Sequence, residues 1–306
     1  MKKFLQSLLL FCAIGIVIGE IIVRVFSLSI DVHQFYLDKD HLIKNYPNQM
    51  GHMGPTHQWV INKYGEFGYE PQSLENLITV IGDSYIANTM NPPECHQANY
   101  LSQLGTGYNF YPSARAGASF IEMMEKAKSL ESLHPKYQLL YVHHGDFIES
   151  VTEIKRNPFT VQLTLKTGEI KYAKPTSGKV KEAIYNFKFI YFLYRNYLFK
   201  LGNNDDATNN RVLLKGKKID YNLINELLVE TGKRYRIQNI VLVFSPDTDP
   251  KVIDMAGKNG FHYFQLQTDD YKSWQMPKDS HWSCYGHQEV AKQVAQYLQQ
   301  QSESIP

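Results

Sequence analysis

A short, unbroken run of apolar residues, Leu77 to Ile81, ends in Gly-Asp-Ser and constrains the fold more than any other part of the chain. A strand with one face in water alternates apolar and polar residues, whereas a strand covered on both faces is apolar throughout. An apolar run of this length is therefore typical of a buried strand in a parallel sheet. We place it near the centre of the domain.

Further segments resemble this run, and helical patterns lie between them. The segments expected as strands are Tyr137–His143, Ile237–Phe244 and Gly260–Gln265, and those expected as helices are 119–130, Tyr221–Arg234 and Gly286–Gln300. Alternating strands and helices predict an α/β fold, with a doubly wound, mostly parallel sheet between two layers of helices, as in flavodoxin. In such folds, binding and catalytic sites collect at the carboxyl ends of the strands.

An insertion of roughly residues 151–215 separates the second of these strands from the third, and it is longer than a crossover needs. Residues 159–172 predict a hairpin that turns at Lys166-Thr167-Gly168, and Asn203–Asn210 is a polar loop. Phe187–Leu201 predicts an aromatic helix that is too short and too charged to span a membrane. We favour packing over the domain, and the alternative is a helix that lies in a membrane interface.

Residues 1–28 have the pattern of a membrane anchor. Lys2 and Lys3 precede an apolar run from Phe4 to Gly19, which resumes after Glu20. The alternatives are a cleaved signal peptide, for which no Ala-x-Ala-like site follows, and lipid attachment at Cys12, which Phe11 disfavours. The lysines predict a cytoplasmic amino terminus, a single-pass anchor and a periplasmic or extracellular domain. Residues 29–75 are expected as an extended stalk that wraps onto the domain of residues 76–306.

Composition and spacing exclude several classes of protein. The net charge is +2 with interspersed signs, so we expect no nucleic-acid partner. No phosphate-binding glycine loop or zinc motif is present, so we expect no cofactor and no metal. His143 and His144 are neighbours on an expected strand, where their side chains would point to opposite faces. The histidines therefore do not predict a shared metal site.

Two segments far apart in the sequence carry residues suited to acyl chemistry. Ser84 follows the first expected strand, and Asp279-Ser280-His281 precedes the last expected helix. A serine hydroxyl needs an imidazole to accept its proton and a carboxylate to hold that imidazole in the right tautomer. Ser84, His281 and Asp279 are therefore candidates for nucleophile, general base and orienting acid.

The three cysteines bear on the same two segments. Cys12 lies in the expected anchor, Cys95 follows the Ser84 segment, and Cys284 lies three residues beyond His281. In an exported domain the last two are permitted to pair. The sequence leaves open a Cys95–Cys284 disulfide and two unpaired thiols.

Taken together, Gly82-Asp83-Ser84 and Asp279-Ser280-His281-Trp282 resemble the motifs of the SGNH hydrolase superfamily, also called GDSL-type esterases. The Asp-x-His-Trp form is also similar to that of periplasmic SGNH-like O-acetyltransferases that act on polysaccharides. The resemblance covers about residues 75–300, and the WVINKYGEFGYEP segment upstream resembles an extension of membrane-tethered members. It implies a three-layer α/β fold and an acyl-serine intermediate.

The resemblance also implies which groups bind the negatively charged oxygen of the intermediate. They are the backbone N–H groups of Ser84 and Gly117, and an Asn side chain of a third motif. Here that motif reads His143-His144-Gly145-Asp146, with Gly145 in the place of the Asn. His144 or His143 could replace the missing donor, and Asp146 is expected as a structural hydrogen-bond partner.

These observations predict a membrane-anchored, extracytoplasmic serine esterase that acts on acyl esters of small molecules, glycans or lipids of the cell envelope. Two alternatives remain at this point. The same three residues serve an O-acyltransferase, since only the final acceptor differs. Gly145 favours a third interpretation, in which a catalytically degraded SGNH domain acts as an envelope binding module.

Overall fold

The structure is a computed structural model that describes residues 1–174, 185–198 and 219–303. The chain forms two compact units, which are described separately. The first comprises Met1–His33, Met50–Trp59 and the described part of residues 176–217; the second comprises Gln34–Gln49, Val60–Pro175 and Lys218–Pro306, as far as they are described. The expected loop Asn203–Asn210 and most of the region between 175 and 215 lie outside the described residues.

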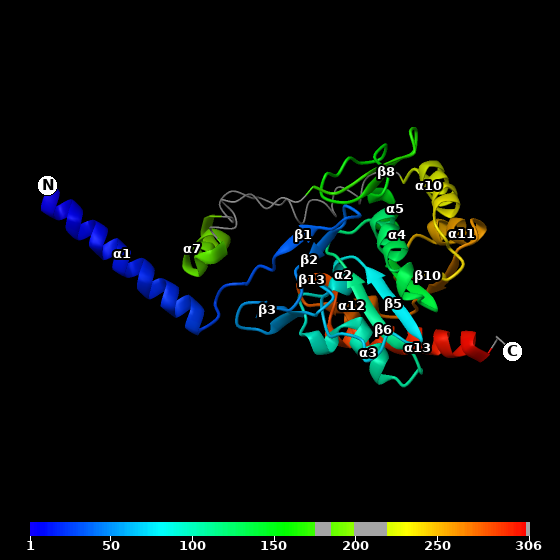
Figure 1. The fold of residues 1–306 in the computed structure, drawn as a ribbon, viewed down its shortest axis with the longest axis horizontal. Helices are drawn as coiled ribbons and strands as arrows, with labels where there is room; N and C mark the ends of the chain where they lie inside the picture. Colours follow the sequence, from blue (N-terminus) through cyan, green and yellow to red (C-terminus); the bar gives the residue numbers. More distant parts are fainter. Residues whose placement is uncertain (175–184, 199–218, 304–306) are drawn as a thin grey trace. The chain divides into compact units, whose positions relative to one another are not determined.

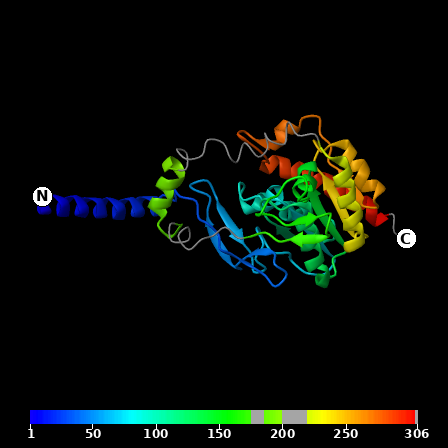
Figure 2. The same ribbon diagram turned by 90° about the horizontal axis from the view of Figure 1, so that it is seen from above.

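The first unit is built on helix α1 (Lys2–Val25), which Figure 1 shows as one continuous helix. Among the described helices, α1 alone is long and apolar enough to cross a membrane. Helix α7 (Lys188–Leu193) and the π-helical turn η3 (Tyr194–Leu198) belong to the same unit. Figure 2 shows α7 beside the carboxyl end of α1, and the two helices are in contact. The aromatic helix predicted from Phe187 therefore packs against the expected anchor.

Residues 29–75, predicted as an extended stalk, contain two short pairs of strands. Strands β1 (Phe35–Leu37) and β2 (Ile43–Asn45) pair antiparallel. Strands β3 (Gln49–His52) and β4 (Gln58–Ile61) form a second pair, which lies where the two units meet in the sequence.

A five-stranded parallel sheet forms the core of the second unit, in the order β11-β10-β7-β5-β6. Its strands are β5 (Leu77–Gly82), β6 (Asn109–Ala114), β7 (Tyr137–Val142), β10 (Ile240–Phe244) and β11 (His262–Gln265). Every residue of β5 is buried, as its apolar sequence predicts. In this order β6 is added on one side of β5, and β7, β10 and β11 are added on the other side. The strand order therefore reverses between β5 and β7, and doubly wound folds position their sites at such a switch point.

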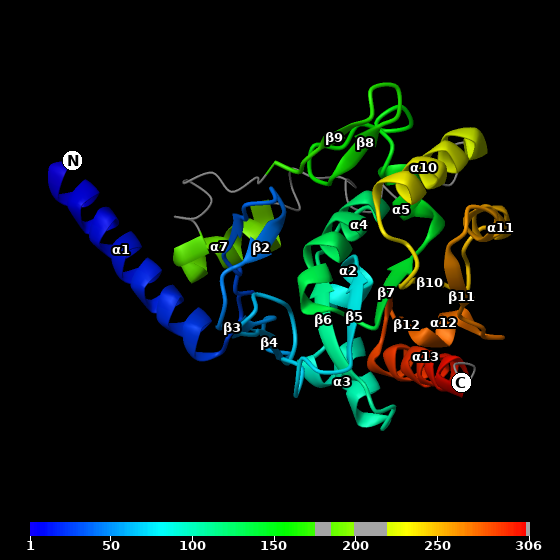
Figure 3. The same ribbon diagram turned by 45° about the vertical axis from the view of Figure 1, so that its right-hand side comes forward.

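Helices cover both faces of this sheet, as Figure 3 shows. Helices α3 (Gln97–Gln103) and α13 (Cys284–Glu303) pack together on one face. Helices α4 (Phe120–Ser129), α5 (His144–Glu149), α10 (Tyr221–Arg234) and α11 (Pro250–Lys258) form a connected layer on the other. The predicted three-layer α/β fold is therefore confirmed.

Shorter elements connect these layers. They are α2 (Ser84–Ala87), η1 (Pro93–Cys95), η2 (Glu131–Leu133), α12 (Tyr271–Trp274) and two antiparallel pairs, β8 (Gln162–Thr164) with β9 (Glu169–Lys171) and β12 (Gln275–Met276) with β13 (Asp279–Trp282). The pair β8–β9 is the hairpin expected between residues 159 and 172. The sequence did not indicate β6, which contains Pro112. Because β6 is an edge strand, a missing N–H is tolerated there.

Candidate active site

Ser84 follows the carboxyl end of strand β5, on the first turn of α2. The Asp83 side chain accepts a hydrogen bond from the Tyr85 N–H at 2.9 Å and so caps this turn. A side chain at Gly82 would collide with Ile86, because a Cβ there would stand 2.4 Å from its Cγ1. Glycine thus allows α2 to turn back sharply against the strand, which presents Ser84 at the edge of the sheet.

His281 and Asp279 reach Ser84 from β13, almost two hundred residues later in the chain. The His281 Nε2 atom lies 2.8 Å from Ser84 Oγ, within hydrogen-bond distance. The His281 Nδ1 atom lies 2.5 Å from Asp279 Oδ1, which also accepts the His281 backbone N–H at 3.0 Å. The structure therefore brings the three predicted residues together as one hydrogen-bonded chain.

Exposure differs along this chain of three residues. The His281 side chain is 17% exposed and the Asp279 side chain 43% exposed, so the carboxylate is the member most open to water. Trp282, the next residue on β13, is buried and anchors the strand in the core. The imidazole is thus held between a buried anchor and the serine, and the carboxylate lies at the end of the chain that is exposed to solvent.

Tyr85 adds a second contact between the two segments, which the sequence did not indicate. Its hydroxyl donates to the Ser280 carbonyl oxygen at 3.0 Å. Its ring lies 4.8 Å from the His281 ring and 5.1 Å from the Trp282 ring, between centroids. A tyrosine directly after the candidate nucleophile therefore supports the backbone and the ring of the candidate base.

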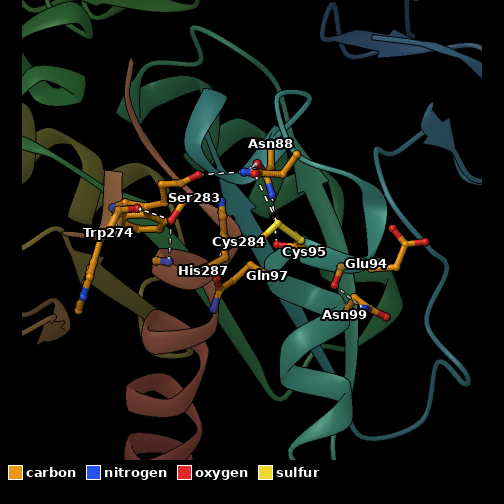
Figure 4. Close-up of a disulfide and its surroundings, with 12 residues drawn as sticks. Asn88, Glu94, Cys95, Gln97, Asn99, Trp274, Ser283, Cys284 and His287 are labelled. Atoms are coloured by element: carbon orange, nitrogen blue, oxygen red, sulfur yellow. Dashed lines mark hydrogen bonds between the residues drawn. A yellow bond between two sulfur atoms is a disulfide. The ribbon is translucent and has the colours of Figure 1, made fainter. Parts of the chain in front are cut away.

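A disulfide joins the same two segments covalently. Cys95 ends η1, Cys284 begins α13, and their sulfur atoms are bonded at 2.00 Å (Figure 4). The buried Asn91 side chain donates to the Asn88 side chain at 2.6 Å and to the Trp282 carbonyl at 2.9 Å. The segment after Ser84 is thus connected to β13 and α13 on several sides.

Two buried histidines lie next to this disulfide. His287 of α13 is fully buried, and its Nδ1 lies 3.2 Å from the Gln97 side-chain amide (Figure 4). Burial lowers the pKa of His287 to about 3 and that of His96 to about 4. Both imidazoles are therefore neutral near neutral pH. They belong to the packing beneath the site and do not reach the reacting atoms.

The residues at the end of β7 depart from the sequence expectation. His143 follows the strand as the N-cap of α5, and its ring lies against the His144 ring, with 3.7 Å between centroids and a tilt of 42°. The prediction that the two side chains point to opposite faces is wrong, because the strand stops at Val142 and its alternation does not extend to them.

The residues of the third motif, His144, Gly145 and Asp146, each make a structural contact. Asp146 is buried and accepts the His143 N–H at 2.7 Å, which closes a capping box. His144 Nδ1 accepts the Asp249 N–H at 3.3 Å, and burial lowers the His144 pKa. The Gly145 N–H donates to His143 Nδ1 at 3.2 Å. The side chains of Asp146 and His144 thus hold α5 and α11 in place.

Gly117 lies just beyond the end of β6, which pairs with β5 up to Gly82 opposite Ala114. Its φ of +74° favours glycine, and a Cβ there would meet no atom within 4 Å among the described residues. The backbone at Gly117 therefore borders open space on the side of the sheet where Ser84 lies.

A metal site is a separate question. Among the described residues, no three or more His, Cys, Asp or Glu side chains form a group that could hold a metal ion.

Comparison with known proteins finds similar solved structures, including two of low sequence identity. No family model and no curated protein matches the chain. A putative lipolytic protein of the G-D-S-L family from Desulfitobacterium hafniense DCB-2 is 10% identical, with 72% of this chain and 99% of that one covered and a TM-score of 0.37. The TesA crystal structure is 9% identical, with 73% and 98% covered and a TM-score of 0.38. Because these values are low, the function is argued from the geometry of this chain.

Proposed function

We propose that the chain is a membrane-anchored, extracytoplasmic serine esterase of the SGNH type. The single observation that supports this most strongly is the hydrogen-bonded chain Ser84–His281–Asp279, at 2.8 and 2.5 Å, at the carboxyl end of β5. Three side chains from two distant segments meet in the order that acyl transfer to serine requires. A serine that packs incidentally against an exposed loop is not expected to form the arrangement serine, imidazole, carboxylate.

In the proposed mechanism, Ser84 Oγ attacks the carbonyl carbon of an ester while its proton moves to His281 Nε2. Asp279 accepts the hydrogen bond from the His281 Nδ1–H and stabilises the imidazolium that forms. The tetrahedral intermediate collapses, the C–O bond to the alcohol breaks, and His281 donates its proton to the leaving oxygen. Water then attacks the acyl-serine with His281 as base, which releases the acid and restores Ser84.

The negative charge on the intermediate needs fixed N–H donors. We assign this role to the backbone N–H groups of Ser84 and Gly117, which border the end of β5. Gly145 provides no side-chain amide at the third position. Loss of one donor typically costs about 100- to 1,000-fold in kcat, so we expect a slow enzyme.

Two observations support the anchored, extracytoplasmic setting. Helix α1 has 24 residues, enough for a hydrocarbon layer of about 30 Å, and begins with two lysines. The Cys95–Cys284 disulfide fits an oxidising compartment outside the cytoplasm. The substrate class that fits this setting is an acyl ester of the cell envelope.

The test is labelling of the full-length protein in detergent with a fluorophosphonate, which modifies activated serines. We expect one adduct, mapped to Ser84 by mass spectrometry, and no adduct in Ser84→Ala. Absence of labelling in the native chain would contradict the proposal and favour the binding module. Release of acyl groups to water or to added sugar separates esterase from O-acyltransferase.

A further inference from the structure

Helix α7 is attached to α1 through the side chain of Glu20. The Glu20 carboxylate of α1 accepts the backbone N–H groups of Lys188 at 3.1 Å and Phe189 at 2.7 Å. These are the first two residues of α7, so Glu20 caps that helix. A Cβ at Gly19 would stand 2.8 Å from the Phe189 ring, so glycine allows the two helices to approach closely.

Neighbouring residues strengthen the same junction. Arg24 donates to Glu20 at 2.8 Å and to the Asn186 carbonyl oxygen at 3.0 Å. Lys188 forms an ion pair with Asp31, which follows α1 in the chain. A carboxylate within an apolar span is costly unless it is paired, and here α7 and Arg24 provide the partners.

The position of Glu20 along α1 sets the depth of α7. Glu20 lies five residues before Val25, the last residue of α1, which corresponds to about 7.5 Å along the helix axis. The apolar length from Phe4 to Val25 is about 33 Å, close to the thickness of a hydrocarbon layer. A bilayer that covers this length therefore reaches the level of the α7 amino terminus.

The exposed side chains of residues 187–198 suit the boundary between lipid headgroups and acyl chains. Phe187 is 55% exposed and Tyr197 59% exposed, and Ile190, Leu193 and Tyr194 are also exposed. Phe26, Val25 and Ile22 at the end of α1 are exposed as well, so the two contacting helices both present apolar side chains outward. Aromatic residues with basic neighbours, here Lys188 and Arg195, are typical of the boundary between headgroups and acyl chains.

We propose that residues 187–198 bind the outer surface of the lipid bilayer as an interfacial segment that is fixed to the anchor by Glu20. This inference rests on the proposed membrane anchoring of α1. The partner is the lipid itself, since the exposed side chains extend the surface that α1 already offers to lipid. The segment thereby places a second contact with the membrane more than 150 residues after the first in the sequence.

The test is depth-dependent quenching in the full-length protein reconstituted in phosphatidylcholine–phosphatidylglycerol vesicles. A fluorophore is attached after Tyr197→Cys in a Cys12→Ser background, and the lipid carries a nitroxide either near the headgroup or deep in the acyl chain. We expect about twofold quenching by the shallow nitroxide and less by the deep one. A label after Tyr263→Cys, an exposed position on β11, should show neither effect.

Two further samples make the outcome decisive. A label at the native Cys12 reports whether α1 is in the bilayer. Quenching at Cys12 with no more quenching at position 197 than at position 263 would overturn the interfacial segment and leave the anchor intact. No quenching at Cys12 would refute the anchor itself. Glu20→Leu removes the cap, so quenching at position 197 should fall while quenching at Cys12 stays unchanged.

Discussion

On one side of the candidate site, the residues that carry Ser84 and His281 are joined by a disulfide, by Asn91 and by Tyr85. On the other side, at the end of β7, the polar groups of His144 and Asp146 hold neighbouring helices, and Gly145 has no side chain. The difference separates two requirements of acyl transfer. The proton-transfer side is rigidly assembled, whereas the charge-stabilising side depends on backbone groups. Four predictions test this contrast.

The largest effect is expected on the assembled side, from Asp279→Asn. The amide cannot hold His281 in the tautomer that accepts the Ser84 proton, so kcat for an aryl acetate should fall about 100- to 10,000-fold. The matched control is Asp247→Asn, because Asp247 also faces a histidine, His143 at 3.7 Å, but lies on the β7 side. Equal losses in the two variants would contradict the distinction.

The next prediction concerns the covalent link. The double variant Cys95→Ser, Cys284→Ser removes the cross-link between two residues that are 189 positions apart in the sequence. The free energy of unfolding in urea should therefore fall by about 2–5 kcal/mol. Cys12→Ser removes a free, exposed thiol and should leave this free energy unchanged. A double variant as stable as Cys12→Ser would show that hydrogen bonds alone hold the two segments together.

On the β7 side, an amide should improve the site. Gly145→Asn is expected to raise kcat/KM about 10- to 100-fold, because it supplies the absent donor. A Cβ at this position meets only His143 Nδ1, at 3.4 Å, so a Cβ is accommodated. Gly145→Ala adds the Cβ without the amide and should change kcat/KM by less than about threefold. If the two variants behave alike, backbone donors suffice.

The smallest effect is expected from His287, which packs beneath the side of the site that carries Ser84 and His281, and it concerns the pH dependence of stability. The pKa of His287 is about 3 in the fold, below its ordinary value of 6.5, so below pH 6.5 the unfolded chain binds the additional proton. The stability is therefore complete above pH 6.5 and is lost as the pH falls. His287→Gln should reduce this slope by about 1.4 kcal/mol per pH unit between pH 6 and 4. Urea unfolding at several pH values measures it, and an unchanged slope would refute the role of His287.

Much of the fold could be predicted because apolar burial leaves a clear pattern. The run Leu77–Ile81 became β5, and the periodicity of Tyr221–Arg234 became α10. Strand β6 was missed because Asn109, Pro112 and Ser113 are polar or unable to donate, which only an edge position tolerates. Position in a sheet depends on long-range pairing, which local composition does not record.

The candidate site was predictable to the same degree. Ser84, His281 and Asp279 were recognisable because the chemistry requires these residue types, and because Ser84 follows a buried strand while Asp279 and His281 share one short segment. Tyr85 and Asn91 were not, because their partners are backbone carbonyls of Ser280 and Trp282, and any polar residue of suitable reach can make such bonds. The orientation of His143 and His144 depended on where a strand ends, which is the least certain property of a sequence pattern.

The proposed anchoring by helix α1 has a consequence for how the rate of the proposed esterase should be expressed. A catalytic unit tied to a sheet of lipid searches a thin layer, so its encounters depend on molecules per area and on the reach of its tether. Esters embedded in or attached to the same surface meet it at a high effective concentration, whereas dissolved esters are diluted by the surrounding volume. Turnover measured on soluble reporters would therefore understate what the anchored form achieves on a surface.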